Sequence, residues 1–316
     1  MKLLIFGAGG VGSVVGGFLA RMGHEVTLLG RPWHLDTVKK QGLTITGIWG
    51  DYRIKALDVC TDIESLRASG EVFDLIILTV KSPDTTAAVR ELATLMGENT
   101  MLLSLQNGLG NIETVLEHVK PEQFLVGRVI FGVELEPGVA RVTVTADDIV
   151  IGPAPGAKPR VTAEQIAHTF ALARIPTRPV ADVLPFIWSK VIYNCALNGI
   201  CTLREMPYGQ ILENAETKNE MAQVVRECYA VAAKMNLALD PPDAEAYLEL
   251  LVGSLIPKTA SHFPSMLQDL RKGKRTDIEA LNGAILRLGR GAGVPTPANE
   301  RITQQVLKKF DSFTYK

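Results

Sequence analysis

Cysteine and long apolar runs are both scarce in this chain of 316 residues. The four cysteines form no C-x-x-C pair, and they are Cys60, Cys195, Cys201 and Cys228. Four dispersed thiols are too few for a disulfide framework in a chain of this length, so we expect a reducing compartment, the cytoplasm. No stretch approaches the ~18 apolar residues that a membrane helix requires. The apolar start after Lys2 ends at Gly7, which favours a strand over a signal segment.

An excess of charge of one sign is also missing. Lysine and arginine number 33, aspartate and glutamate 34, and the formal net charge is -1. This balance gives no general attraction to nucleic acid or to an anionic membrane surface. The patterns G-x-S-x-G and G-x-x-x-x-G-K-[S/T] do not occur, and the five histidines have no metal-ligand spacing. We therefore expect neither a hydrolase of the nucleophile-elbow type, nor a P-loop enzyme, nor a metal site.

The first half of the chain alternates short apolar runs with helical patterns, as parallel sheets with crossover helices do. The predicted strands are residues 3–6, 25–29, 74–80, 100–105, 124–131, 140–144 and 149–151. An apolar stripe between residues 11 and 19 predicts a helix after the first strand. Residues 43–48 and 52–57 read as a hairpin inserted at the edge of the sheet.

Strand-like alternation ends around Pro176, Pro179 and Pro185, and helical patterns fill the rest of the chain. The predicted helices are residues 184–201, 216–236, 244–255, 265–270, 277–290 and 299–310. A chain this long exceeds the usual size of one hydrophobic core. The sequence therefore predicts an α/β fold class: a Rossmann-type parallel-sheet domain over residues 1–181, then an all-α domain over residues 182–316.

A glycine motif follows the first predicted strand directly and opens the first predicted helix. The motif G-x-G-x-x-G consists of Gly7, Ala8, Gly9, Gly10, Val11 and Gly12. In this context its glycines allow a tight turn, a close approach of backbone to a pyrophosphate, and close packing of helix on strand. The helix N-terminus then meets the anion with free N–H groups. The motif predicts a dinucleotide site; a glycine-rich turn without a ligand is the alternative.

The end of the second predicted strand indicates which dinucleotide is bound. An NAD site usually has an acidic residue there, about 20 residues beyond the glycines. This chain has Arg31 instead, after Gly30. A guanidinium can bind a 2′-phosphate with two hydrogen bonds, so the sequence favours NADP(H) over NAD(H). The alternative is that Arg31 is a solvated loop residue.

The first long helix of the second half carries a polar stripe among apolar residues. Lys190, Asn194 and Asn198 follow one another at four-residue spacing and so share one face. A helix that is apolar nearly all round should be buried, and its lysine and asparagines then need polar partners. We expect a ligand site beside the nicotinamide rather than the exposed stripe of an amphipathic helix.

Two later segments match the capping-box pattern of a helix start. They begin at Ser265 and Thr276, with Gln268 and Glu279 three residues on. Capping explains both completely. A serine hydroxyl and the neighbouring acid Asp277 are nevertheless also groups that can receive a carboxylate and a hydroxyl.

Together these motifs make the chain resemble the ketopantoate (2-dehydropantoate 2-) reductases over nearly its whole length. The resemblance rests on the glycine motif with Arg31, Thr79-Val80-Lys81, Gln106-Asn107-Gly108, the Lys190, Asn194 and Asn198 spacing, Ser265-Met266-Leu267-Gln268-Asp269, and Thr276-Asp277-Ile278-Glu279-Ala280-Leu281-Asn282-Gly283. It implies an NADPH-dependent reductase of a small 2-oxo acid, with 2-dehydropantoate as the leading substrate, in pantothenate and hence coenzyme A synthesis. The oligomeric state is left open, although helical second domains of this kind often provide a homodimer surface.

The resemblance also implies roles for single residues. Arg31 and Lys81 would hold the phosphate and adenosine end of the cofactor, and Asn107 would lie near the nicotinamide and contact both ligands. Lys190 would be the general acid that polarises the C2 carbonyl oxygen and protonates the alkoxide. The substrate would be oriented by Asn194 and Asn198, its carboxylate would meet Ser265, and its terminal hydroxyl would bond Asp277.

Two departures from the family pattern keep the substrate open. Members usually have glutamate where Asp277 stands, one methylene longer, and Glu279 is about 200° away around a helix. Tyr208 stands where some members have the asparagine of P-N-G. A reductase of another acid is therefore an alternative: an opine, a β-hydroxy acid or a different branched 2-oxo acid. A further alternative is an NADP-sensing protein without catalysis. In a sensor, NADPH would bind without turnover of a 2-oxo acid, and Lys190→Ala would change only stability.

Overall fold

The structure, a computed structural model, describes residues 1–314 and divides them into two compact units. The first comprises Met1–Gln106 and Asn111–Val183. The second comprises Asn107–Gly110 and the chain from Leu184 onward. Four residues of the first half thus belong with the helical unit. No helix within residues 1–314 is both long and apolar enough to span a membrane.

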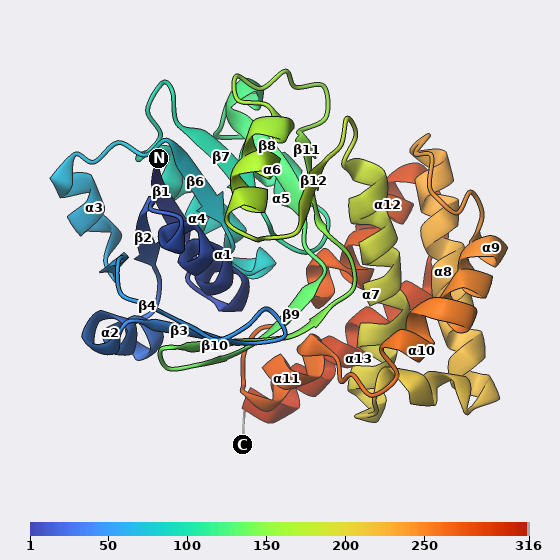
Figure 1. The fold of residues 1–316 in the computed structure, drawn as a ribbon. Coiled ribbons are helices and arrows are strands. Elements are labelled where there is room, and N and C mark those ends of the chain that lie inside the picture. The colour runs from blue at the N-terminus through green and yellow to red at the C-terminus, as the bar shows by residue number, and fades with distance from the viewer. Residues whose placement is uncertain (315–316) are drawn as a thin grey trace. The chain divides into compact units, whose positions relative to one another are not determined.

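The first unit is built on an eight-stranded sheet with the strand order β12-β11-β8-β7-β6-β1-β2-β5 (Figure 1). The strands are β1 (Lys2–Phe6), β2 (Glu25–Leu29), β5 (Asp58–Cys60), β6 (Leu75–Leu78), β7 (Met101–Ser104), β8 (Phe124–Arg128), β11 (Ile149–Pro153) and β12 (Thr177–Pro179). All neighbours run parallel except β8 and β11. The predicted Rossmann-type parallel sheet is confirmed.

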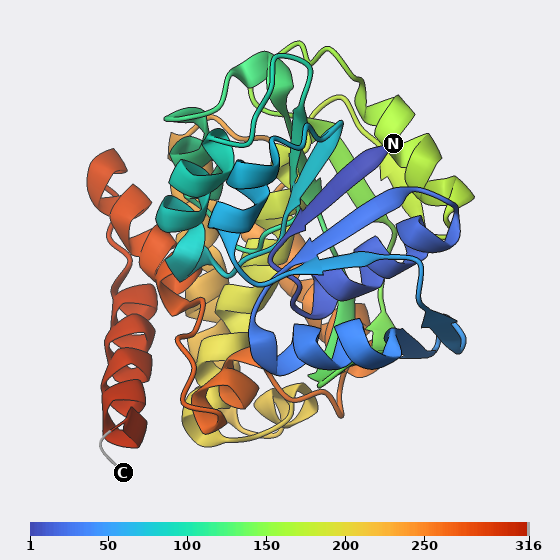
Figure 2. The same cartoon turned by 90° about the vertical axis from the view of Figure 1, so that its left-hand side faces the viewer.

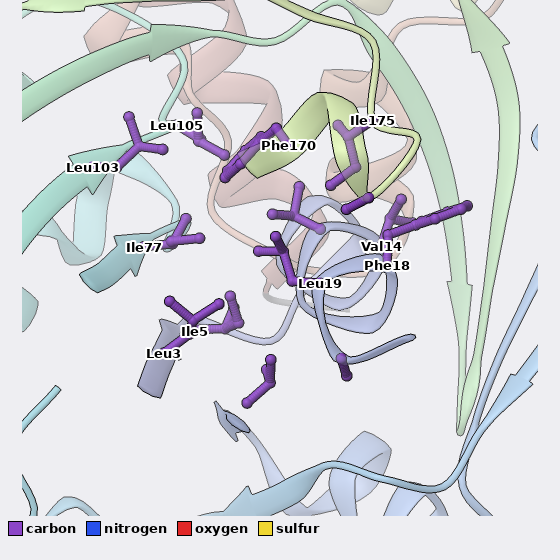
Figure 3. Packing of buried hydrophobic residues seen from close by; sticks show 14 of the residues in the cluster. Leu3, Ile5, Val14, Phe18, Leu19, Ile77, Leu103, Leu105, Phe170 and Ile175 are labelled. Carbon is purple, nitrogen blue, oxygen red and sulfur yellow. The ribbon is translucent and has the colours of Figure 1, made fainter. Parts of the chain in front are cut away.

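Helices cover both faces of this sheet (Figure 2). They are α1 (Gly10–Arg21), α2 (Pro32–Gln41), α3 (Ile63–Ser69), α4 (Thr85–Ala93), α5 (Asn111–Leu116) and α6 (Ala163–Leu172). Phe18 and Leu19 of α1 and Phe170 of α6 are buried against Ile5 and Ile77 of the central strands (Figure 3). Since the central strands are buried on both faces, they consist of continuous apolar runs, which made them recognisable in the sequence.

A second, four-stranded sheet has the order β4-β3-β10-β9. Its strands are β3 (Leu43–Gly47), β4 (Tyr52–Ile54), β9 (Phe131–Glu136) and β10 (Val139–Thr145). The predicted hairpin is therefore real, but its predicted place at the edge of the main sheet is wrong. There β5 pairs with β2, while β3 pairs with β10 and buries Leu43 and Ile45. The single strand predicted over residues 124–131 is likewise divided, between β8 and β9.

The second unit is helical, as predicted. Its helices are α7 (Leu184–Arg204), α8 (Ala215–Lys234), α9 (Ala244–Leu250), α10 (Ile256–Lys258), α11 (Ser265–Arg271), α12 (Asn282–Ala292) and α13 (Pro297–Thr314). Two expected helices are interrupted. A π-helical turn, Leu251–Leu255, follows α9, and the helix expected from residue 277 is a short 3₁₀ turn, η5 (Ile278–Ala280), before α12.

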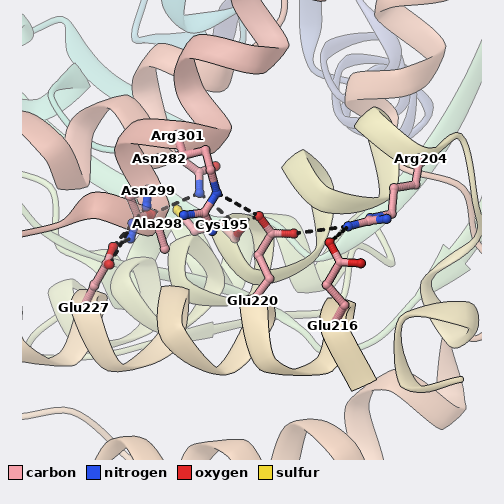
Figure 4. Close-up of polar contacts among 9 residues, drawn as sticks. All are labelled: Cys195, Arg204, Glu216, Glu220, Glu227, Asn282, Ala298, Asn299 and Arg301. Carbon is pink, nitrogen blue, oxygen red and sulfur yellow. Dashed lines mark hydrogen bonds and ion pairs between the residues drawn. The ribbon is translucent and has the colours of Figure 1, made fainter. Parts of the chain in front are cut away.

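Polar contacts join four helices of this unit (Figure 4). Asn282 of α12 donates through Nδ2 to the Cys195 carbonyl oxygen of α7 at 3.1 Å and to Asn299 Oδ1 of α13 at 3.0 Å. The Glu227 carboxylate of α8 accepts from the backbone N–H groups of Ala298 and Asn299 at 2.8 and 3.0 Å. This carboxylate caps the first turn of α13, where free N–H groups favour an anion. The cluster orients α7 within its unit.

Candidate functional site

The glycine motif forms the turn between β1 and α1. Gly7 has φ +111°, and a Cβ there would lie 2.7 Å from the Val80 backbone nitrogen. At Gly12 a Cβ would lie 2.5 Å from the Gly7 carbonyl oxygen and 2.6 Å from Thr79 Oγ1, which donates to that same carbonyl. These two glycines are therefore required by the fold itself, because they let helix, turn and strand approach closely.

Gly9 differs from its neighbours, because nothing in the first unit requires a glycine there. Its φ is -84° and its ψ is -161°, an extended conformation open to any residue. Beyond its chain neighbours, the heavy atom nearest to a Cβ at this position would be the Gly7 carbonyl oxygen, 3.9 Å away. No contact within the first unit therefore accounts for a glycine at this position. The first turn of α1 follows immediately and offers N–H groups to an anion.

Arg31 and Lys81 follow β2 and β6, the two strands that flank β1 in the sheet. Parallel strands end at one edge, so both cations flank the glycine turn at the carboxyl edge, where α/β sheets bind ligands. Arg31 is 70% exposed, and its Nη2 lies 3.6 Å from Asp84 Oδ2. Such an exposed pair is worth about 0–1 kcal/mol, so an anionic ligand can replace the carboxylate as the partner of Arg31.

Asn107 belongs to the loop that joins the helical unit. Gly108 has φ +87°, and a Cβ on it would lie 2.6 Å from Ala280 Cβ. The next residue, Leu109, donates its N–H to the Ala280 carbonyl oxygen at 2.8 Å. The loop is thereby docked on η5, and Asn107 Oδ1 accepts a hydrogen bond from Lys190 Nζ. The docked loop thus places Asn107 beside Lys190 of α7.

A small cavity of about 10 Å³, the space of roughly one water molecule, lies within the helical unit. Its lining is mainly polar and consists of Asn107, Asn194, Asn198, Ser265, Met266, Asp269, Asp277 and Leu281. All five residues predicted to bind substrate are therefore brought together. Lys190 is not part of the lining, and it reaches the cavity through Asn107.

The cavity presents amides, a hydroxyl and two carboxylates. Asn194 and Asn198 lie one turn apart on α7, and Ser265 is the exposed first residue of α11. Such a lining can donate to a carboxylate or carbonyl oxygen through its amides and hydroxyl, and can accept from a hydroxyl through its acids.

Sequence reasoning misjudged the local structure of two of these segments. The residue before Ser265, Pro264, occupies the N-cap position of α11, and no side chain caps that helix, so the capping box expected from Ser265 is absent. Thr276 Oγ1 accepts from the Ile278 N–H at 3.4 Å, but no reciprocal bond from Glu279 forms. The tighter 3₁₀ geometry of η5 replaces the α-helical turn that a capping box needs.

Three lining residues were not anticipated as site residues: Met266, Asp269 and Leu281. Asp269 stands four residues after Ser265 on α11, and this spacing would have placed it on the same face. Met266 and Leu281 have apolar side chains like any core residue and carried no such signal.

Comparison with known proteins agrees with this architecture. Residues 3–156 match the family model "Ketopantoate reductase PanE/ApbA", and residues 182–309 match "Ketopantoate reductase PanE/ApbA C terminal". The 2-dehydropantoate 2-reductase of Aquifex aeolicus is 41% identical over 310 residues, which cover 98% of this chain and 97% of that one. The chain belongs to the ketopantoate reductase family. It is thus a member of a family of oxidoreductases that act on a CH–OH group.

Solved structures of family members and of a related dehydrogenase resemble the fold. A PanE/ApbA family ketopantoate reductase from Ralstonia eutropha has a TM-score of 0.87 at 31% identity and covers 99% of both chains. D-mandelate dehydrogenase, solved with NADH and anilino(oxo)acetate, has a TM-score of 0.88 at 26% identity, with complete coverage of both chains. Within residues 1–314, no group of three or more His, Cys, Asp or Glu side chains forms a metal site.

Proposed function

We propose that this protein reduces 2-dehydropantoate to pantoate with NADPH, using Lys190 as the proton donor. The observation that carries the proposal is the contact between Lys190 and Asn107, because Asn107 lines a cavity of amide, hydroxyl and carboxylate groups. A relative that is 41% identical bears the name 2-dehydropantoate 2-reductase. An ammonium group beside such a cavity is suited to a carbonyl oxygen that gains negative charge.

The glycine turn and the cations at the carboxyl edge of the sheet fit a phosphorylated dinucleotide. Gly9 leaves room for a pyrophosphate beside the first turn of α1, while Gly7, Ala8, Gly10, Val11 and Gly12 shape the turn. Arg31 and Lys81 bind the 2′-phosphate and the adenosine end, since no acidic residue takes the place of Arg31 after β2. When bound, the cofactor supplies the hydride.

Lys190 and Asn107 act on the C2 oxygen of the substrate. The ammonium polarises the carbonyl and then gives a proton from Nζ to the alkoxide oxygen. Asn107 accepts a hydrogen bond from Nζ through Oδ1 and so holds the ammonium beside the cavity that Asn107 lines. Because the loop of Asn107 is docked on Ala280, this pair is positioned before the substrate arrives.

The remaining lining binds the rest of the acid. Ser265 donates to the substrate carboxylate, Asn194 and Asn198 orient the substrate through their amides, and Asp277 accepts from the terminal hydroxyl. Only Met266 and Leu281 are apolar, so the cavity suits a short hydroxylated chain better than an aromatic ring. This lining favours 2-dehydropantoate over the aryl 2-oxo acids that resemble the ligand in the D-mandelate dehydrogenase structure.

Steady-state kinetics tests the proposal. A panel of 2-oxo acids is followed by loss of NADPH absorbance, with 2-dehydropantoate, phenylglyoxylate and a branched 2-oxo acid included. We expect 2-dehydropantoate to have the highest kcat/KM. Binding of NADPH without turnover of any acid would favour the sensor alternative. A higher kcat/KM for another acid would show that this acid, and not 2-dehydropantoate, is the substrate.

Variants of Lys190 test the proton donor. Lys190→Met should lower kcat by about 10²–10⁴-fold, the usual contribution of a general acid. Lys190→Arg keeps the positive charge but transfers its proton poorly, so it should recover only part of the loss. Lys218→Met is the matched control, since Lys218 is an exposed lysine of α8. Full activity in Lys190→Met would show that Lys190 is not the proton donor.

A further inference from the structure

Tyr208 is a buried phenol that touches the cavity lining without being part of it. It begins η3 (Tyr208–Leu212), is 4% exposed, and donates its hydroxyl to Asn198 Oδ1 on α7. Asn198 is also 4% exposed, and it lines the cavity. The amide oxygen of Asn198 is therefore already bonded by a residue that lies outside the cavity lining.

The nitrogen of the Asn198 amide, Nδ2, has a different environment from the oxygen. No hydrogen bond joins Asn198 Nδ2 to any residue in the described part of the chain. The Asn198 side chain is largely desolvated, but Nδ2 itself keeps some accessible surface, so an acceptor that reaches it can complete its hydrogen bonding. The cavity is where Asn198 meets open space, so an acceptor atom of a bound ligand can supply this partner.

The position of the phenol is itself fixed by its surroundings. The Tyr208 ring lies 5.9 Å from the Tyr193 ring at 89° and 5.4 Å from the His262 ring. Its backbone N–H donates to the His262 carbonyl oxygen at 3.0 Å. Tyr193 in turn shares a hydrogen bond of 2.8 Å with Thr259 Oγ1. Tyr208 is thus held from two sides and cannot follow a rotation of the Asn198 amide.

The hydroxyl also keeps its proton. Burial raises the pKa of the Tyr208 phenol well above its ordinary value, and the nearby Tyr193 and Cys201 add to this. The phenol therefore keeps its proton and needs an acceptor. Within residues 1–314 its hydroxyl bonds Asn198 Oδ1 and no other acceptor, so Oδ1 is the end of the amide that faces it.

We propose that Tyr208 is a positioning residue that determines substrate specificity: its hydroxyl fixes the Asn198 amide so that Nδ2 faces the cavity as a donor. The ligand class follows from the donor and from Asp277 in the same lining. A hydroxyl group can accept from Nδ2 and donate to a carboxylate at once. The cavity therefore selects 2-oxo acids that carry a hydroxyl over those that lack it. This inference rests on the proposed reduction of a 2-oxo acid.

The test compares two substrates that differ by one hydroxyl, 2-dehydropantoate and 3,3-dimethyl-2-oxobutanoate. The discrimination ratio is the kcat/KM of the first divided by that of the second. Tyr208→Phe removes only the donor and should lower this ratio by about tenfold, the effect of one fixed hydrogen bond. The change should appear mainly in KM for 2-dehydropantoate. Tyr229→Phe is the matched control, since its hydroxyl bonds the Pro241 carbonyl oxygen and neither a lining residue nor Tyr208, and it should keep the wild-type ratio.

A second variant keeps the inference testable if Tyr208→Phe folds poorly. Asn198→Asp retains an oxygen for the phenol but replaces the donor nitrogen, so it should also lower the ratio. In an Asn198→Ala background, Tyr208→Phe should have no further effect on the ratio, because Tyr208 acts through that amide. An unchanged ratio in Tyr208→Phe, or in Asn198→Asp, would overturn the inference.

A spectroscopic readout separates this inference from the proposed function. In protein labelled with ¹⁵N-asparagine, the Asn198 NH₂ signals are identified by their loss in Asn198→Asp. They should shift when 2-dehydropantoate is added to the wild type, and they should broaden in Tyr208→Phe as the amide rotates. A shift without turnover would refute the reductase and keep the inference. Turnover without a shift would refute the inference and keep the reductase.

Discussion

Two glycines of the same motif should respond to alanine in opposite ways, because one serves the fold and the other a ligand. In Gly12→Ala the new Cβ would lie 2.5 Å from the Gly7 carbonyl oxygen and 2.6 Å from Thr79 Oγ1, closer than such atoms approach in real structures. In Gly9→Ala the new Cβ would lie 3.9 Å from the Gly7 carbonyl oxygen, an ordinary contact, and the backbone conformation already suits alanine. The fold thus resists the first substitution and accepts the second.

The magnitudes follow from the cost of overpacking, which is about 1–3 kcal/mol for an added methyl group in a filled site. Gly12→Ala should lower the free energy of unfolding of the protein by about that amount. Gly9→Ala should leave it within about 0.5 kcal/mol of wild type, or raise it slightly through the unfolded chain. Its cost should instead fall on cofactor affinity, where 1–3 kcal/mol is about a 5- to 150-fold rise in Kd.

Urea unfolding followed by circular dichroism gives the first quantity, and fluorescence titration with NADPH gives the second. Wild-type affinity in a folded Gly9→Ala protein would refute the claim that a pyrophosphate approaches this backbone. A Gly12→Ala protein of wild-type stability would show that the turn relaxes, and the packing argument for that glycine would then be wrong.

The remaining predictions concern the cofactor edge and a buried histidine of the first unit. Arg31→Asp should shift the NADPH over NADH ratio of specificity constants about a hundredfold toward NADH, as loss of a charged hydrogen-bond pair implies, while Asp84→Asn keeps the preference because Arg31 remains. His34 is 1% exposed between Ser13 and the β9–β10 turn, and burial lowers its pKa below 6.5. The unfolded chain therefore binds the proton first, and stability falls as pH drops from about 6.5 toward the folded pKa. The urea midpoint should fall more steeply with acid in wild type than in His34→Gln, and equal slopes would contradict this assignment.

Much of the first unit was predictable because its signals are local. Continuous apolar runs identified β1, β2, β6 and β7, and the glycine spacing identified the turn after β1. The exception was the second sheet. The pairing of β3 with β10 joins residues nearly a hundred positions apart, and no periodicity in either segment specifies a partner. The hairpin was recognised because its two strands, β3 and β4, are adjacent in the sequence. Its location was missed because it depends on β10, which is far away in the sequence.

The substrate cavity was predictable only in part, since side chains from four separate segments form it. The stripe of Asn194 and Asn198 was evident from helical spacing, but the segments of Ser265 and Asp277 also fitted a capping box, which they do not form. Asn107 was expected from family resemblance alone. Its place in the helical unit depends on Gly108 packing on Ala280, a contact that leaves no periodic pattern in the sequence.

The dinucleotide turn is therefore formed by backbone and the cavity by side chains, and this difference explains why Tyr208 matters. A dinucleotide turn is made by backbone, so its specificity lies in glycines and a helix start that spacing reveals. The cavity is made by side-chain amides, and an amide has two chemically opposite ends of equal size. Which end of Asn198 meets the ligand is decided by the residue behind it, and here that residue is a phenol. A departure from the family pattern at Tyr208 can thus alter substrate choice without touching the substrate, while the proton donor Lys190 stays as it is.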